Sequence, residues 1–223
     1  MIEPEFPADE SARQAAVEKY EILDTLPERA YDDLTSLMAE LCDAPIALIG
    51  LIDRDRHWLK SHHGVDLSES PRAISFCGHA ILTPSDVFVI EDARRDPRFA
   101  DNPIVTDYGV VSYAGAPLVD ENGFALGTLC VFDRRPRTLT DAQLTALKNM
   151  ADNVMYLLER HLRERRLERA TADLAQRNED LQHFAGVVSH DILGPVNTIT
   201  GFLELLGEDA TDEGLRTDLR MLH

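Results

Sequence analysis

The stretch YAGAPLVDENGFALGTLCVF, residues 113–132, decides the fold that this sequence predicts. Two apolar segments of strand length, 113–119 and 125–132, flank the polar turn Asp120-Glu121-Asn122-Gly123. Asn-Gly between two such segments is among the strongest local signals for a β-hairpin, because both residues tolerate the positive φ of a tight turn. The sequence therefore predicts two adjacent antiparallel strands here.

Further strands are predicted on the N-terminal side of this hairpin. The apolar run IALIGLI, residues 46–52, has strand length and is followed by the polar turn 53–56 and a returning segment at 57–61. A further strand is expected at 87–90, before a long polar loop at 91–111. Together these segments predict an antiparallel sheet.

Helices are expected on both sides of the strands. Apolar residues spaced three and four apart predict a helix that ends at Pro45, and shorter helices are expected at 11–21 and 74–82. Antiparallel strands flanked by helices give the fold class α+β. We expect the domain to span 25–139, after an N-terminal helix and connector at 1–24.

A long helix is predicted to follow this domain. Thr140 and Gln143 form the pattern of a capping box, and from Leu144 apolar residues keep helical spacing along a narrow seam. The five-residue step from Leu162 to Leu167 breaks that spacing, as in coiled coils whose winding changes locally. A long helix with a narrow apolar seam needs a partner chain, so we expect segment 140–182 to join two copies in a parallel homodimer.

Composition limits the classes of function. The formal net charge of -18 argues against nucleic-acid binding. The sequence has no apolar run long enough for a membrane span and no secretory signal, so we expect a cytoplasmic protein. Cys42, Cys77 and Cys130 are too few and too scattered for a disulfide framework or for the usual spacing of a zinc site.

The segment FAGVVSHDILGPV, residues 184–196, followed by GFLELL at 201–206, resembles the phosphoacceptor motif of histidine kinases, in particular the phytochrome-like subgroup. The resemblance implies that 183–223 is the first part of a dimeric helical bundle, with a hairpin loop at 207–214 and a second helix beginning near 215. It also implies that His190 accepts a phosphoryl group, while Asp191 orients its ring or serves as general base.

The sequence departs from the pattern of histidine kinases in two respects. Gly194 stands where many family members have a Thr or Asn that positions water for dephosphorylating the response regulator. No ATP-binding motifs follow, so we expect a truncated kinase that is inactive alone. ATP and magnesium would enter only with the missing catalytic domain, acting in cis or in trans, and no cofactor is expected within this chain.

The first domain resembles the GAF domains of signalling proteins. The resemblance rests on Ile22–Glu28, Asp53-x-x-Arg56-x-Trp58-x-Lys60, Phe76-Cys77-Gly78-His79-Ala80, Asp96-Pro97-Arg98-Phe99, residues 113–118 and residues 127–130. It implies a small-molecule pocket, although the fold does not name the ligand. The residues expected to line that pocket are Trp58, Phe76, Cys77, His79 and Cys130.

The histidines and cysteines could also have other roles. Gly78 separates Cys77 from His79, whereas the bilin attachment site of phytochromes has the two residues adjacent, so we expect no covalent bilin. We expect His57 to be solvated or to cap an element, because no constellation surrounds it in the sequence.

These observations predict a sensor histidine kinase of a two-component phosphorelay. Its GAF domain would control phosphorylation of His190 and transfer to the receiver domain of a response regulator. Two alternatives stay open at this point. One is a non-catalytic, dimeric GAF module that binds a ligand, and the other is a thiol or metal redox sensor that uses Cys77 and Cys130.

Overall fold

The computed structural model of the chain describes residues 1–209. The chain divides into two compact units, Met1–Glu164 and Arg165–His223. Among the described residues, no helix is both long enough and apolar enough to cross a membrane.

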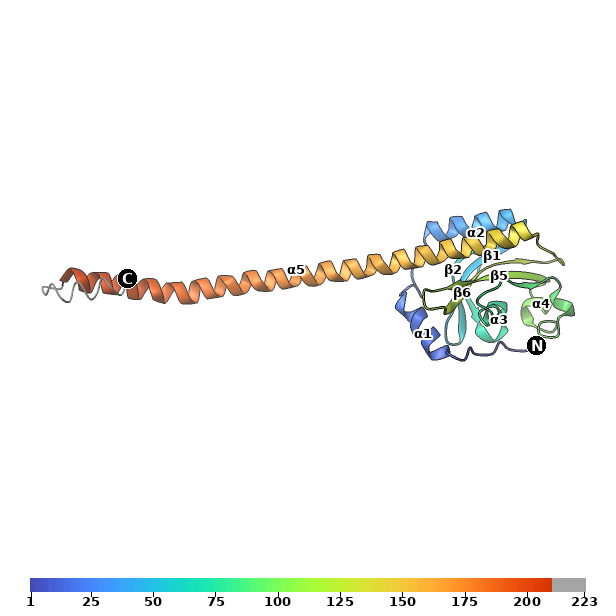
Figure 1. Cartoon of the computed structure of the whole chain (residues 1–223), viewed down its shortest axis with the longest axis horizontal. Coiled ribbons are helices and arrows are strands. Elements are labelled where there is room, and N and C mark those ends of the chain that lie inside the picture. The colour runs from blue at the N-terminus through green and yellow to red at the C-terminus, as the bar shows by residue number, and fades with distance from the viewer. Residues whose placement is uncertain (210–223) are drawn as a thin grey trace. The chain divides into compact units, whose positions relative to one another are not determined.

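The first unit is built on one antiparallel sheet of six strands in the order β3-β2-β1-β6-β5-β4. Figure 1 labels β1, β2, β5 and β6 of this sheet. Its strands are β1 (Ile46–Ile52), β2 (Arg56–His63), β3 (Glu69–Pro71), β4 (Phe88–Ile90), β5 (Ser112–Val119) and β6 (Ala125–Asp133). The two central strands, β1 and β6, are buried along their whole length. Burial on both faces explains their nearly continuous apolar sequences.

The predicted hairpin and the α+β fold class are confirmed. β5 and β6 pair along their lengths around a turn in which Asp120 Oδ1 accepts hydrogen bonds from the backbone N–H groups of Asn122 and Phe124, each at 2.9 Å. Gly123 has a φ of 87°, which a residue with a side chain rarely adopts.

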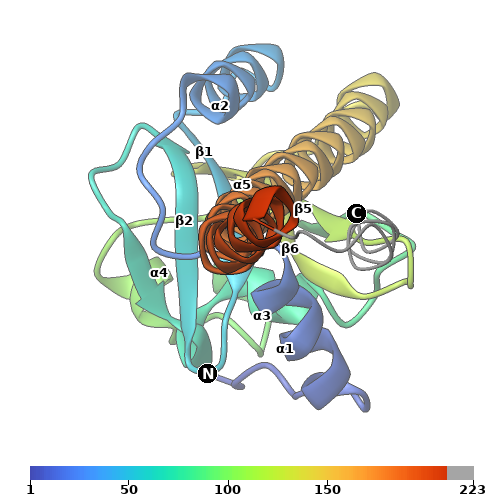
Figure 2. The same cartoon turned by 90° about the vertical axis from the view of Figure 1, so that its left-hand side faces the viewer.

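Helices cover both faces of the sheet. They are α1 (Glu10–Lys19), α2 (Arg29–Leu41), α3 (Phe76–Ala80), α4 (Pro103–Thr106) and α5 (Asp141–Asp209), with single 3₁₀ turns at Arg72–Ile74 and Ala93–Arg95. α2 and the first turns of α5 lie on one side, and α3 and α4 on the other (Figures 1 and 2). One core forms under α1, α2 and α5, and a second core forms under α3 and α4.

The elements that the sequence did not predict are short and are held by caps. The expected loop at 91–111 contains α4, which starts where Asn102 Oδ1 accepts a hydrogen bond from the N–H of Ile104, with Pro103 at the first helical position. The helix expected at 74–82 is only α3, because Ser75 caps it at Gly78 N. The three-residue strand β3 is too short to show alternation.

α5 begins as the sequence predicts. The N–H of Gln143 donates to Thr140 Oγ1, and the N–H of Thr140 donates to Gln143 Oε1, which completes a capping box. The helix then continues through Pro195. Its first turns complete the core of the first unit with the buried side chains of Leu147, Ala151, Val154, Met155, Leu158 and Leu162.

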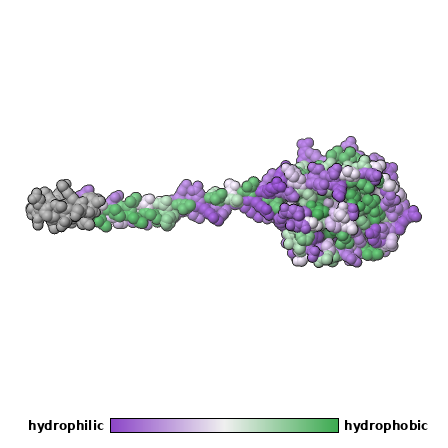
Figure 3. Space-filling view, viewed as in Figure 1, coloured by the Kyte–Doolittle hydropathy of each residue, from purple (hydrophilic) through white to green (hydrophobic). Residues whose placement is uncertain are grey.

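In the second unit, residues 165–209 form helix with an exposed apolar seam (Figure 3). Leu167, Leu174 and Leu181 recur every seven residues along it and are each about two-thirds exposed. The hairpin loop and second helix predicted from residue 207 onward lie outside the described residues, apart from 207–209, which are helical.

A buried ionic cluster fixes α1 to the sheet. Glu10 accepts hydrogen bonds from Arg13 Nε at 2.7 Å and from Arg72 Nη1 at 2.5 Å, and both arginines are almost fully buried. Arg13 also donates to the carbonyl of Ile52 at the end of β1, at 2.8 Å. Burial raises the pKa of Glu10, but the two guanidinium groups outweigh it and hold that pKa at about 2.

This cluster predicts acid-sensitive stability. The lowered pKa of Glu10 means that its contribution is fully present above the ordinary value of 4.5 and is lost as the pH falls toward 2. We expect Glu10→Gln to lower the free energy of unfolding by about 2 kcal/mol at pH 7, after discounting for partial exposure. Urea denaturation from pH 7 to pH 2.5 should show this deficit shrinking. The exposed control Glu40→Gln should change little, and an equal deficit in both variants would contradict the assignment.

Candidate functional site

A cavity of about 220 Å³ lies under the second core, on the side of the sheet that carries α3 and α4. Its floor comes from β1, β2 and β6, and its roof from the segment 65–76 and the region around α4. Most of its lining is apolar, including Leu48, Leu59, Val110 and Phe132. A concave, mainly apolar site with a few polar groups is the usual form of a small-molecule pocket.

His57 is a buried polar residue of this lining. Only 4% of the residue is exposed, and Nε2 has no hydrogen-bond partner among the described residues. Its ring lies over Gly50 on the neighbouring strand, where any Cβ would overlap it. The glycine therefore provides the space that the imidazole occupies. A buried ring nitrogen left unpaired is costly unless a ligand or water binds it.

The expectation that His57 is solvated was wrong. The sequence signal that we missed is the pattern of β1, in which Ile46, Leu48 and Ile52 face the second core and Gly50 leaves a gap between them. A large side chain on the adjacent strand fills such a gap, and β1 pairs antiparallel with β2.

The structure separates the residues that were predicted to line a pocket. Phe76 lines the cavity, whereas Cys77 and Cys130 lie in the same core without lining it. Trp58 belongs to the opposite core, under α2 and α5, because neighbouring residues of a strand face opposite sides of the sheet.

His79 has a structural environment of its own. Its Nε2 lies 3.1 Å from the carbonyl oxygen of Ile2, and its ring meets the Phe99 ring edge-on with centroids 4.9 Å apart. Burial lowers the pKa of His79, which favours the neutral ring. These contacts fix the N-terminal segment of the chain against α3.

Cys77 and Cys130 converge, as the redox alternative requires. Their Sγ atoms lie 3.6 Å apart, and the Tyr113 hydroxyl donates to Cys77 Sγ at 3.5 Å. Burial raises the pKa of Cys130 well above its ordinary value. Burial also opposes ionisation of Cys77, but its contacts with Cys130, His57 and Thr128 outweigh that cost and lower its pKa.

Metal binding has no geometric support in the described part of the chain. Residues 1–209 contain no group of three or more His, Cys, Asp and Glu side chains placed to hold a metal ion. The metal version of the redox alternative therefore has no site there.

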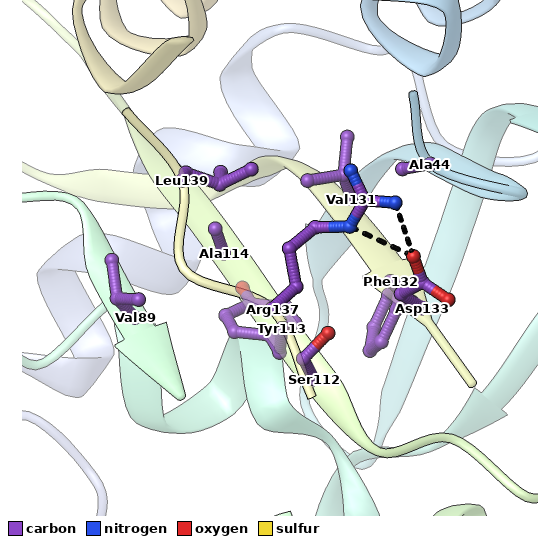
Figure 4. A pocket seen from close by; sticks show the side chains of 10 residues that line it. All are labelled: Ala44, Val89, Ser112, Tyr113, Ala114, Val131, Phe132, Asp133, Arg137 and Leu139. Atoms are coloured by element: carbon purple, nitrogen blue, oxygen red, sulfur yellow. Dashed lines mark hydrogen bonds and ion pairs between the residues drawn. The ribbon is translucent and has the colours of Figure 1, made fainter. Parts of the chain in front are cut away.

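A second hollow lies where β5 begins and β6 ends (Figure 4). Its volume of about 10 Å³ holds at most one water molecule. Beside it, Arg137 pairs with Asp133 at 2.7 Å and donates to the carbonyls of Cys42 and Asp43, at 2.5 and 2.6 Å. Arg137 therefore fixes the linker before α5 to the end of α2. The residues around this hollow have a structural role.

His190 and Asp191 lie far along α5, in the second unit, where the backbone is helical. The Asp191 side chain is exposed. No residue of the cavity comes from this unit.

The comparisons with known proteins identify the class of the first unit. The profile of the GAF domain family matches residues 26–158, which is more than half of the chain. With its six-stranded sheet and its cavity, the chain belongs to the GAF domain family.

Among individual proteins, the chain is similar to the cyclic di-GMP phosphodiesterase PA2567 of Pseudomonas aeruginosa. The two are 39% identical over 157 residues, which cover 70% of this chain and 27% of that protein. The chain therefore spans about a quarter of the length of the curated relative that it matches.

Two solved structures share the fold at low sequence identity. The bacteriophytochrome RpBphP3 of R. palustris superposes with a TM-score of 0.54 at 13% identity, covering 79% of this chain and 42% of that one. The blue-light absorbing form of the PixJ GAF domain of Thermosynechococcus elongatus gives a TM-score of 0.52 at 13% identity, covering 71% and 94%. Both support the fold alone.

The predicted histidine-kinase function is contradicted. The curated relative is a cyclic di-GMP phosphodiesterase, and the family match is to a GAF domain rather than to a kinase domain. The motif around His190 covers a short helical segment, whose apolar seam and exposed polar residues also suit a plain dimerising helix. The roles predicted for His190 and Asp191, and for a response regulator and an ATP-binding domain, depended on that function and are not carried further.

The packing of His57 on Gly50 predicts a reciprocal pair of substitutions. Gly50→Ala should lower the free energy of unfolding by about 1–3 kcal/mol, because its methyl group overlaps the imidazole. In a chain that already carries His57→Ala, adding Gly50→Ala should lower the free energy of unfolding much less, because the imidazole that the methyl group would overlap is gone. Denaturant titrations of the three variants measure this coupling. Additive effects would mean that the ring does not occupy the space above Gly50.

Proposed function

We propose that this chain is a non-catalytic sensor module in which the GAF domain binds a small, mainly apolar molecule. The observation that carries this proposal is the 220 Å³ cavity lined by His57, a residue whose Nε2 is buried without a hydrogen-bond partner among the described residues. An apolar cavity of about 150 Å³ is large enough to bind benzene. The cavity here therefore suits a molecule of one or two rings.

The polar lining narrows the chemistry of this ligand. His57 offers one hydrogen bond deep in the cavity, while Glu69 and Arg134 are exposed residues in its lining. Glu69 already accepts from Arg56 at 2.8 Å. One exposed arginine is a poor match for the two phosphates of a cyclic dinucleotide, so we propose an uncharged ligand that pairs with His57.

A route from the cavity to α5 follows from strand geometry. β1 and β6 present Leu48 and Phe132 to the core that holds the cavity, and alternate residues Ile49 and Val131 to the core beneath α5. If these strands have two packings, a ligand that binds one of them more tightly would raise its population, to an extent set by the ratio of the two affinities. The position of α5 would change with the packing of the strands.

We propose cyclic di-GMP signalling as the context, supported by the name of the relative from P. aeruginosa. Because the chain spans about a quarter of that relative, the catalytic output would be carried by another part of the protein. In this proposal the cyclic dinucleotide is turned over by that output and is not the ligand of the cavity.

The homodimer remains part of the proposal. Leu167, Leu174 and Leu181 leave an apolar seam with a period of seven residues, which a second copy of the same helix would cover. Arg165 pairs with Glu168, and Arg177 with Asp173, on the sides of this helix. A polar surface on both sides of an apolar seam is the usual pattern of a coiled coil.

Ligand binding can be tested with two matched probes. Indole and indene have nearly the same size and shape, but only indole carries an N–H that can donate to His57 Nε2. We expect titration calorimetry to detect binding of both probes to the parent chain. His57→Phe should weaken the affinity for indole by about tenfold, the equivalent of one hydrogen bond, and should change the affinity for indene little. The control Leu37→Ala, on the exposed surface of α2, should bind both probes like the parent chain.

Two results would count against the pocket. One is the absence of binding by either probe. The other is equal loss of indole and indene in His57→Phe, which would mean that the substitution only disturbs packing.

The dimer predicts a change of mass in solution. Sedimentation equilibrium of the chain should give about 50 kDa, twice the 25.0 kDa of one copy. Leu174→Asp combined with Leu181→Asp places charges in the seam and should give the monomer mass. The control Asn178→Asp adds a charge between these two positions and should remain dimeric. A monomer mass for the parent chain at all concentrations would contradict the proposal.

A further inference from the structure

We propose that Cys77 and Cys130 are a redox couple that closes to an intramolecular disulfide when a hydroperoxide enters the domain. The two sulfur atoms come from α3 and from the central strand β6 and lie 3.6 Å apart. This proposal does not depend on ligand recognition by the cavity.

The polar groups around the pair favour an ionised Cys77. The Tyr113 hydroxyl donates to Cys77 Sγ at 3.5 Å. Burial opposes ionisation of Cys77, but its interactions with Cys130, His57 and Thr128 lower its pKa.

The third cysteine shows what an inert buried thiol looks like in this protein. Cys42 lies in the opposite core, under α2 and α5. Burial raises the pKa of Cys42, and the charge of Arg137 opposes that effect without outweighing it. A thiol in such an environment behaves as a small hydrophobic side chain, so Cys42 serves as an internal reference.

The cavity would bring a small oxidant to residues next to the pair. His57 and Phe76 both line it, and Phe76 precedes Cys77 in α3. Hydrogen peroxide is close to water in size, and the cavity has room for several waters. The oxidant would therefore reach Phe76 and His57 while the domain stays folded, although Cys77 itself does not line the cavity.

The chemistry takes two steps and balances. The Cys77 proton passes to His57, and the thiolate attacks one oxygen of the peroxide, whose O–O bond breaks to give a sulfenic acid and hydroxide. That hydroxide takes the proton from His57 and leaves as water. The Cys130 thiol then attacks the sulfenic sulfur and the S–O bond breaks, giving the disulfide and a second water. Two thiols lose two electrons, and one peroxide is reduced.

Disulfide formation would reshape the cavity wall. The sulfur atoms must move from 3.6 Å to about 2.05 Å, so α3 and β6 approach each other. Both elements line the cavity, through Phe76 and Phe132 respectively. Oxidation therefore acts on the same strands and helix as the proposed ligand.

The test counts thiols in the reduced full chain before and after treatment with a fewfold excess of hydrogen peroxide. After quenching, the protein is unfolded and alkylated, and its intact mass is measured. We expect three alkylated cysteines to become one, with a peptide map that joins Cys77 to Cys130 and leaves Cys42 alkylated. Cys42→Ser should form the disulfide at the parent rate.

Two variants examine the mechanism. Cys130→Ser removes the second thiol, so a dimedone adduct should accumulate at Cys77. His57→Phe should slow disulfide formation by at least tenfold, whether or not it changes indole binding. Failure of both probes to bind would leave this inference intact, because the thiol count does not depend on them.

Three results would overturn the inference. The first is retention of three alkylated thiols after peroxide treatment of the parent chain, which needs no folded variant. The second is oxidation that involves Cys42 as readily as the pair. The third is a disulfide between chains instead of within one chain, seen as a doubled mass without reductant.

Discussion

The structure depends on the burial of β1 and β6 on both of their faces. Most residues of these two strands pack either in the core beneath α5 or in the core that holds the cavity. This constraint explains their nearly continuous apolar sequences. A change of packing on one side of the sheet also shifts the packing on the other side, because packed interiors have few voids to absorb it. Sensing and transmission in our proposal both use this property.

The sequence predicted the regular elements well where local signals are strong. The hairpin at 113–132, the strand at 46–52 and the capping box at Thr140 are each encoded by neighbouring residues. The site was harder to predict, because its parts meet only through strand pairing. Nothing local in the sequence shows that His57 fills the space above Gly50, or that Cys77 meets Cys130. Which core Trp58 packs in depends likewise on the register of its strand, which local sequence does not give.

The error about function has a different origin. The motif around His190 was interpreted through its resemblance to a kinase family, whereas the family match is to a GAF domain over residues 26–158 and the relative with 39% identity is a cyclic di-GMP phosphodiesterase. A short helical motif constrains mainly the pattern of apolar residues, which many dimerising helices share. The fold by itself leaves the function open, so the function has to be argued from the residues of the site.

The shared core at the start of α5 limits how this domain can be transplanted. Leu147, Val154 and Leu158 are almost fully buried against the sheet, although they belong to a helix that continues into the second unit. A fragment cut at residue 139 would expose that apolar surface and would be expected to aggregate. Chimeric proteins that borrow this sensor should therefore keep the chain through residue 164 and join the new output along the helix. Inserting a whole number of helical turns there would keep the apolar seam on the same face of the helix, whereas inserting a fraction of a turn would rotate the seam.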